Sequence, residues 1–419
     1  YKDGSTDTKP LSEFTSLNKQ PAIDAVNKAA EDKIAEINAN TNATAEEKAA
    51  AIEKVNADKA KALTAINDNS VTTKAALDNA KTSGTTAISN DNPVVTKKNT
   101  AKAAIDSALR AKEAAIDAND DLTTEEKNAA KADAQAKANA AKTAIDNATT
   151  NVAVDSAQTA GTTSVSSVMP TAVAKPAAKK AIEDALKAKV AQLDARNDLT
   201  TEEKEAAKAD AQARATAAKN NIDTATTNST VDNAKTTGVA DVESVNPQAS
   251  QKKTDAKNAV DEALKAKEAE IDANNDLTAE EKSKAKEDAK SKADVAKQAI
   301  DNATTNDAVT QAKNAGAISV DSVTPTPVAK PAAKQAIDDA LKAKNDAIDA
   351  NNDLTDEEKA KAKEDAKAKA DAAKQAIDNA TTNDAVEQAK NDGATSISSV
   401  TPTPTAKPAA KQAIDDALK

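Results

Sequence analysis

The sequence contains no cysteine, no histidine and no tryptophan, and its aromatic residues are Tyr1 and Phe14 alone. Without cysteine the chain can form neither disulfides nor thiolate metal sites. Without cysteine and histidine it lacks the common pairs of nucleophile and general base. Nucleic-acid binding uses basic patches and stacking aromatics, but lysine here alternates with acidic residues and the formal net charge is −11. We therefore expect no enzyme, no cofactor, no metal and no nucleic-acid partner.

Long apolar runs are missing as well. The composition is 39% hydrophobic, most of it alanine, and no run approaches the ~20 apolar residues that a membrane span requires. No signal peptide opens the sequence and no Leu-Pro sorting motif closes it. We expect a fragment of a longer protein, without membrane insertion.

What the sequence does contain is one short motif that occurs five times. A threonine is followed three residues later by a glutamate, which is the capping box that marks a helix start. The spacing of 77–79 residues between copies indicates tandem domains. The five pairs are Thr44 and Glu47, Thr123 and Glu126, Thr200 and Glu203, Thr278 and Glu281, and Thr355 and Glu358.

Glycine and proline recur in the same register, and the prolines predict the joints between domains because proline interrupts a helix. We predict a leader at 1–20 and a truncated sixth repeat at 402–419. The five complete repeats are predicted at 21–92, 93–169, 170–246, 247–324 and 325–401. The prolines are Pro93, Pro170, Pro247, Pro325 and Pro402.

The fifth repeat shows three helical patterns, which we call helices A, B and C. Helix A begins near Pro331, because proline suits a first helical position, and helix B runs from Thr355 to about Asp378. Helix C has Asn383 as its predicted N-cap. The apolar residues of helix A share one face, at Ile337, Leu341 and Ile348. Those of helix B are mostly alanine, at Ala362, Ala366, Ala373 and Ile377.

A glycine lies in the apolar stripe of every helix C. In the fifth repeat this stripe is Val386, Ala389, Gly393, Ile397 and Val400. The glycine either lies inside a continuous helix, where it admits a neighbouring backbone, or caps the end of a shorter one. The continuation of the stripe beyond it favours the continuous helix. The equivalent glycines are Gly84, Gly161, Gly238 and Gly316.

Three helices joined by short turns predict an all-α fold of tandem antiparallel three-helix bundles that form an elongated rod. The predicted core of the fifth repeat has few large side chains, so each bundle should be marginally stable. These are Val328, Ile337, Leu341, Ile348, Leu354, Ile377, Val386, Ile397 and Val400.

Two patterns imitate chemical sites. The stretch 349–355 resembles the opening of a calcium loop, but an EF-hand needs glycine at position 6 and glutamate at position 12, where this chain has Leu354 and Ala360. We interpret it as a helix end followed by a capping box. Glu357 and Glu358 are paired carboxylates, but acid–base catalysis needs burial or coupling that an exposed first turn lacks. We therefore predict no catalytic residues.

The linked motifs Lys330-Pro331-Ala332-Ala333-Lys334, Leu354-Thr355-Asp356-Glu357-Glu358-Lys359 and Val400-Thr401-Pro402 resemble a known repeat over residues 21–419. It is the roughly 75-residue helical repeat, formally a domain of unknown function, of cell-wall-anchored surface proteins of staphylococci, streptococci and lactobacilli. Those proteins include the giant extracellular-matrix-binding protein. The resemblance implies an extracellular, wall-anchored location, with signal peptide and anchor outside this segment.

Two functions remain open at this point. Near-identical copies with proline joints favour a structural stalk that projects an adhesive region away from the cell wall. Alternatively, helix faces of the repeats bind host extracellular-matrix or serum proteins, although the tryptophan, tyrosine and clustered arginine typical of binding hot spots are lacking. We expect a monomer in either case.

Overall fold

The computed structural model describes residues 16–419, so the first fifteen residues of the predicted leader lie outside the described part. Within residues 16–419 every regular element is an α-helix, which confirms the predicted all-α fold. The chain divides into two compact units, Tyr1–Ala185 with Arg214–Val242, and Leu186–Ala213 with Glu243–Lys419.

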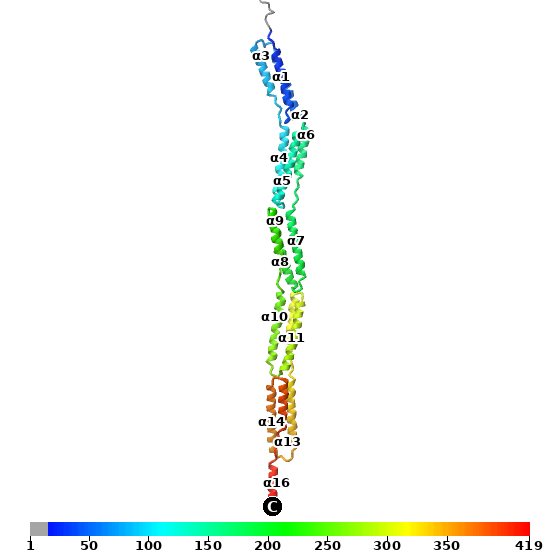
Figure 1. Cartoon of the computed structure of the whole chain (residues 1–419), viewed down its shortest axis with the longest axis vertical. Helices are drawn as coiled ribbons and strands as arrows, with labels where there is room; N and C mark the ends of the chain where they lie inside the picture. Colours follow the sequence, from blue (N-terminus) through cyan, green and yellow to red (C-terminus); the bar gives the residue numbers. More distant parts are fainter. Residues whose placement is uncertain (1–15) are drawn as a thin grey trace, which may run out of the picture. The chain divides into compact units, whose positions relative to one another are not determined.

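The helices follow one another in triplets (Figure 1). The first two triplets are α1 (Gln20–Asn38), α2 (Ala45–Asn67), α3 (Lys74–Ser89), α4 (Lys97–Asp117), α5 (Thr124–Asn147) and α6 (Asn151–Ser166). The third and fourth are α7 (Ala174–Asp194), α8 (Thr201–Thr224), α9 (Asn228–Glu243), α10 (Gln251–Asp272), α11 (Ala279–Asn302) and α12 (Asn306–Asp321). The last helices are α13 (Ala329–Asp349), α14 (Asp356–Asn379), α15 (Asn383–Ser398) and α16 (Ala406–Ala417).

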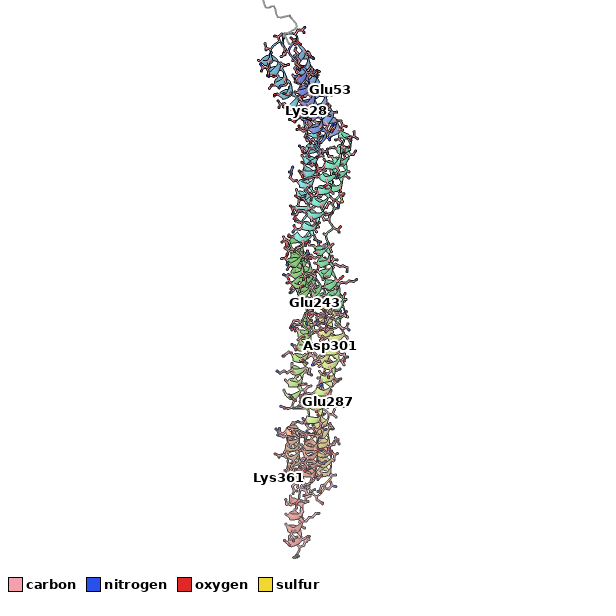
Figure 2. All side chains as sticks on the ribbon, turned by 45° about the horizontal axis from the view of Figure 1, so that its top comes forward. Lys28, Glu53, Glu243, Glu287, Asp301 and Lys361 are labelled. Carbon is pink, nitrogen blue, oxygen red and sulfur yellow. The ribbon has the colours of Figure 1, made fainter. Side chains whose placement is uncertain are left out.

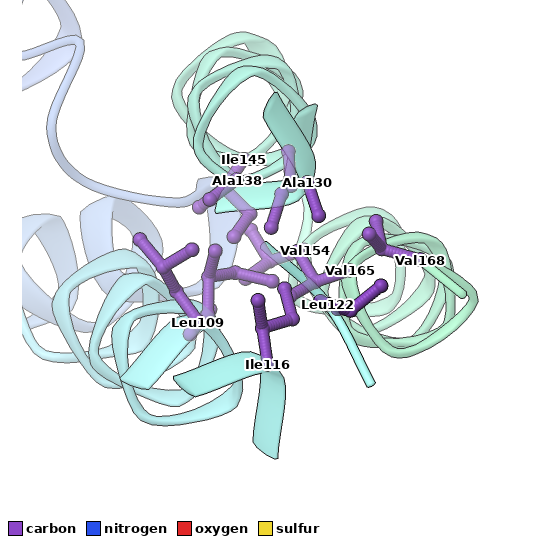
Figure 3. Packing of buried hydrophobic residues seen from close by; sticks show 13 residues of the cluster. Leu109, Ile116, Leu122, Ala130, Ala138, Ile145, Val154, Val165 and Val168 are labelled. Atoms are coloured by element: carbon purple, nitrogen blue, oxygen red, sulfur yellow. The ribbon is translucent and has the colours of Figure 1, made fainter. Parts of the chain in front are cut away.

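The second repeat shows how a triplet forms a bundle. Helices α4, α5 and α6 each contact the other two, and their short connections make successive helices antiparallel. Figure 3 shows the side chains that meet between them, with Leu109 and Ile116 from α4, Ile145 from α5, and Val154 and Val165 from α6. Alanines fill the rest of the α5 stripe, so the helices can approach closely. Triplets α1–α3, α10–α12 and α13–α15 make the same mutual contacts.

The third triplet contributes residues to both compact units. In the first unit, Gly238 of α9 lies against Ala218 of α8 and Ile182 of α7. In the second unit, a separate cluster contains Leu193, Ala207, Ala211 and Val245. Both sets occupy core positions equivalent to those of the second repeat.

The five predicted capping boxes are present. In the fourth repeat the N–H of Glu281 donates to Thr278 Oγ1 at 3.3 Å, and the N–H of Thr278 donates to Glu281 Oε1 at 2.9 Å. The Thr278 side chain is fully buried. The predicted starts of all five B helices are therefore confirmed at Thr44, Thr123, Thr200, Thr278 and Thr355.

The in-register glycines lie inside continuous helices, as the stripe predicts. None of the described glycines has a positive φ, so none is a left-handed helix cap. A Cβ atom on Gly161 would lie 2.5 Å from Ala141 Cβ and 2.7 Å from Ile105 Cδ1. The backbone Cα of Ala141 would lie 3.6 Å from the same Cβ, so the glycine admits both the side chain and the backbone of the neighbouring helix.

Three details of the fifth repeat differ from prediction. Val328, which we predict in the core, is 65% exposed, because it is the N-cap residue of α13 and its side chain faces solvent. Helix α13 begins two residues before Pro331, which therefore occupies the third helical position. The N-cap of α15 is Thr382 and not Asn383, because the Thr382 hydroxyl accepts the N–H of Ala385 at 3.0 Å.

Charged side chains cover the outer faces of the helices, where Figure 2 labels Lys28, Glu53 and Glu287 among others. Many form pairs along one helix, such as Lys28 with Asp32 at 2.9 Å and Lys290 with Asp294 at 3.2 Å. Exposed pairs of this kind contribute little to stability. Their main effect is to keep the outer faces polar while the alanine stripes turn inward.

Candidate functional site

One set of recurring polar contacts lies where one repeat meets the next. We call each such place a junction. It joins the start of helix B in one repeat to the start of helix A, and in four cases the B–C turn, of the following repeat. Each of the five junctions lies within one compact unit.

The glutamate of the capping box serves two repeats at once. While Oε1 of Glu281 closes its own box, Oε2 accepts the N–H groups of Val328 at 2.9 Å and Ala329 at 3.3 Å. These amides begin helix A of the fifth repeat, where N–H groups have no partner within the helix. The equivalent amide contacts are Glu47 with Thr96 and Lys97, Glu126 with Val173 and Ala174, Glu203 with Gln251, and Glu358 with Thr405. At the third junction the Ser250 hydroxyl also donates to Glu203 Oε1 at 2.5 Å.

The glutamate before it binds the B–C turn of the next repeat. Glu280 Oε2 accepts the N–H of Asn383 at 2.9 Å, and the N–H of Ala279 donates to the carbonyl of Thr381 at 2.7 Å. Both donors begin helices, so each junction satisfies orphan amides of two repeats. The equivalent glutamates and amides are Glu46 with Asn151, Glu125 with Asn228, and Glu202 with Asn306.

A buried lysine completes the junction. Lys330 is 4% exposed, and its Nζ donates to the carbonyls of Asn275 and Asp378, each at 2.7 Å. Asn275 belongs to the A–B turn of the preceding repeat and Asp378 to the end of α14, where the helix dipole favours a cation. Lys98 and Lys175 make the equivalent pairs of bonds, and Lys253 bonds the carbonyl of Asp301.

The junction carboxylates are held in their ionised form. Burial raises the pKa of Glu126, but hydrogen bonds from the backbone N–H groups of Thr123, Val173 and Ala174 outweigh it, so that the pKa is lowered. The pKa values of Glu47, Glu203 and Glu281 are lowered by the same balance. The N–H groups of Thr355 and Thr405 lower the pKa of Glu358 to about 2.

Acid should therefore loosen the junctions. Folding lowers the pKa of these carboxyls from the ordinary value of 4.5. Each carboxylate therefore contributes its full stability above pH 4.5, and this contribution is lost as the pH falls toward the pKa of the folded state. For Glu358 this stability is lost between pH 4.5 and about pH 2. We expect exchange of the Val173, Val328 and Thr405 amides, corrected for intrinsic rates, to accelerate below about pH 4.5. Exchange that stays constant down to pH 2.5 would contradict this.

The two patterns that imitated chemical sites have structural partners. In the calcium-like stretch, Asn351 Oδ1 accepts the N–H of Asp353 at 3.1 Å, and Asp349 pairs with Lys363 at 2.7 Å. Glu358 belongs to the fifth junction, and its pKa is lowered, whereas that of a general acid is raised.

Among residues 16–419 no group of three or more His, Cys, Asp or Glu residues is placed to hold a metal. No helix in the same range is long and apolar enough to cross a membrane.

Sequence reasoning missed the junction lysine and the second role of the box glutamates. The available signal was a lysine at a fixed position near each helix A start, in register with the prolines. These residues are Lys98, Lys175, Lys253, Lys330 and Lys407.

One protein family matches the chain along nearly its whole length. It is described as a domain of unknown function, DUF1542, and it matches five consecutive segments, 18–96, 97–173, 174–250, 252–328 and 329–405. No curated protein and no solved structure matches the chain.

Proposed function

Because the chain belongs to the DUF1542 family through five consecutive repeats, we propose that it is a structural spacer in a bacterial surface protein, outside the cell. Tandem repeats of this family suggest a repeated surface-protein domain. The proposal adds that the segment projects an adhesive region away from the cell wall.

The junction carries this proposal. Each of the first four ties the A–B end of one repeat to the B–C end of the next, and these are opposite ends of a bundle. A repeat held at opposite ends adds its own length to the chain, which is about 35 Å for a helix of 24 residues. Because the bonds go mainly to backbone groups, they tolerate changes of side chain between repeats.

Small-angle X-ray scattering of the whole chain tests the proposal. Five repeats of about 35 Å give a maximum dimension of roughly 175 Å and a radius of gyration of roughly 50 Å. A compact protein of this length would have a radius of gyration of only about 22 Å. A value near the compact limit, in a sample shown to be monomeric by light scattering, would rule out the spacer.

A further inference from the structure

The first repeat has a buried carboxyl where the other repeats have a buried valine. Asp91 follows helix α3 and is 3% exposed. The residues at the same position, two before the linker proline, are 5–6% exposed and pack into the cores of their bundles. They are Val168, Val245, Val323 and Val400.

The surroundings of Asp91 leave one carboxyl oxygen without a donor. Its Oδ2 atom is buried and has no hydrogen-bond partner, and its Oδ1 atom lies 3.8 Å from Lys54 Nζ. Asp58, which is half-buried on the same helix as Lys54, adds a second negative charge beside Asp91. From α1, Lys33 faces the same place, but its Nζ donates to Asn92 Oδ1 at 2.6 Å and to Glu36 at 3.4 Å.

A reversal of charge on helix B accompanies this substitution. In the other repeats the position of Asp58 carries a basic residue, which is Lys137, Arg214, Lys292 or Lys369. The position of Lys54 carries an aspartate there, which is Asp133, Asp210, Asp288 or Asp365. The first repeat alone therefore places a second carboxyl beside a buried one. A divalent cation fits poorly, because it would face the ammonium groups of Lys54 and Lys33.

We propose that Asp91 holds a proton in the folded first repeat, and that loss of this proton as the pH rises loosens the end of the repeat. In the protonated state a neutral carboxyl occupies the position at which the other repeats bury a valine. The proton exchanges with bulk water. After it leaves, a buried carboxylate lies beside a second negative charge, which is unfavourable. This inference does not depend on the spacer function.

The direction of the effect is opposite to that at the junctions. Burial raises the pKa of Asp91, and the negative charge of Asp58 raises it further. The positive charges of Lys54 and Lys33 lower the pKa, but their effect is smaller. The protonated Asp91 therefore contributes its full stability to the first repeat below pH 3.8, the ordinary pKa of an aspartate. This contribution is lost as the pH rises through the raised pKa of Asp91. Acid tightens this site while it weakens the junction glutamates.

Hydrogen–deuterium exchange of the whole chain between pH 3.5 and 7, corrected for intrinsic rates, tests the proposal. The last turn of α3 (Lys74–Ser89) should lose protection as the pH rises, about tenfold for each pH unit between 3.8 and the raised pKa. The last turn of α6 (Asn151–Ser166), which precedes Val168, is the control within the same sample and should not lose protection.

Two variants distinguish a proton on Asp91 from a general effect of pH. Asp91→Asn keeps the shape without a titrating proton, and Asp91→Val restores the residue of the other repeats, so both should remove the dependence. Equal pH profiles for α3 and α6 in the unmodified chain would overturn the proposal. So would an Asp91→Asn variant that retains the loss of protection.

Discussion

Replacing Ile145 by alanine is expected to lower the free energy of unfolding of the second repeat by about 2–5 kcal/mol. Ile145 is fully buried in the cluster where α4, α5 and α6 meet (Figure 3), so its truncation leaves a cavity in a closely packed core. Such a loss is a large fraction of the stability of a small domain, about 5–15 kcal/mol. The amides of α4–α6 should therefore exchange faster, because this repeat unfolds locally more often.

The matched control for this variant is Val152→Ala in the same repeat. Val152 is 74% exposed on α6, so its truncation should change stability by no more than about 0.5 kcal/mol. The other four repeats in the same sample provide an internal reference. Equal protection of α5 in the two variants would show that the alanine-rich interior does not depend on its large side chains.

Local signals explain why so much of the fold could be predicted. A capping box depends on residues three apart, so the starts of the B helices at Thr44 and its equivalents follow from sequence alone. The apolar stripe through Gly393 likewise follows from helical periodicity. The prediction for Val328 is wrong because an apolar residue near a helix suggests burial, whereas at the N-cap of α13 this side chain faces solvent.

The junction could not be predicted in the same way, because it depends on how two bundles meet. Nothing within three or four residues of Lys330 shows that its ammonium group will bind carbonyls 55 positions before and 48 positions after it. An isolated lysine on a helix is usually exposed, and burial of a charge is favourable only with such partners. Glu281 was recognised for its local bond, but its second oxygen has a partner 47 residues away.

Replacing Glu281 by glutamine is expected to separate the two roles of this residue. Glutamine keeps one acceptor oxygen, so it can close the capping box at Thr278 or bind the linker amides, but not both. Hydrogen bonds to a charged group are worth about 1.5–3 kcal/mol, so we expect a loss of that size at the fourth junction. The amides of Val328 and Ala329 should lose protection, while the Thr278 amide keeps most of its own.

The control for the change of charge is Glu287→Gln, an exposed position on the same helix that lies outside the junction (Figure 2). Both variants remove one negative charge from α11, but only Glu281→Gln should expose the two linker amides. If the amides of Val328 and Ala329 exchanged equally fast in both variants, the carboxylate would not be what holds the fifth repeat to the fourth. The buried Lys330 and the Ala279 to Thr381 bond would then have to hold the two repeats together by themselves.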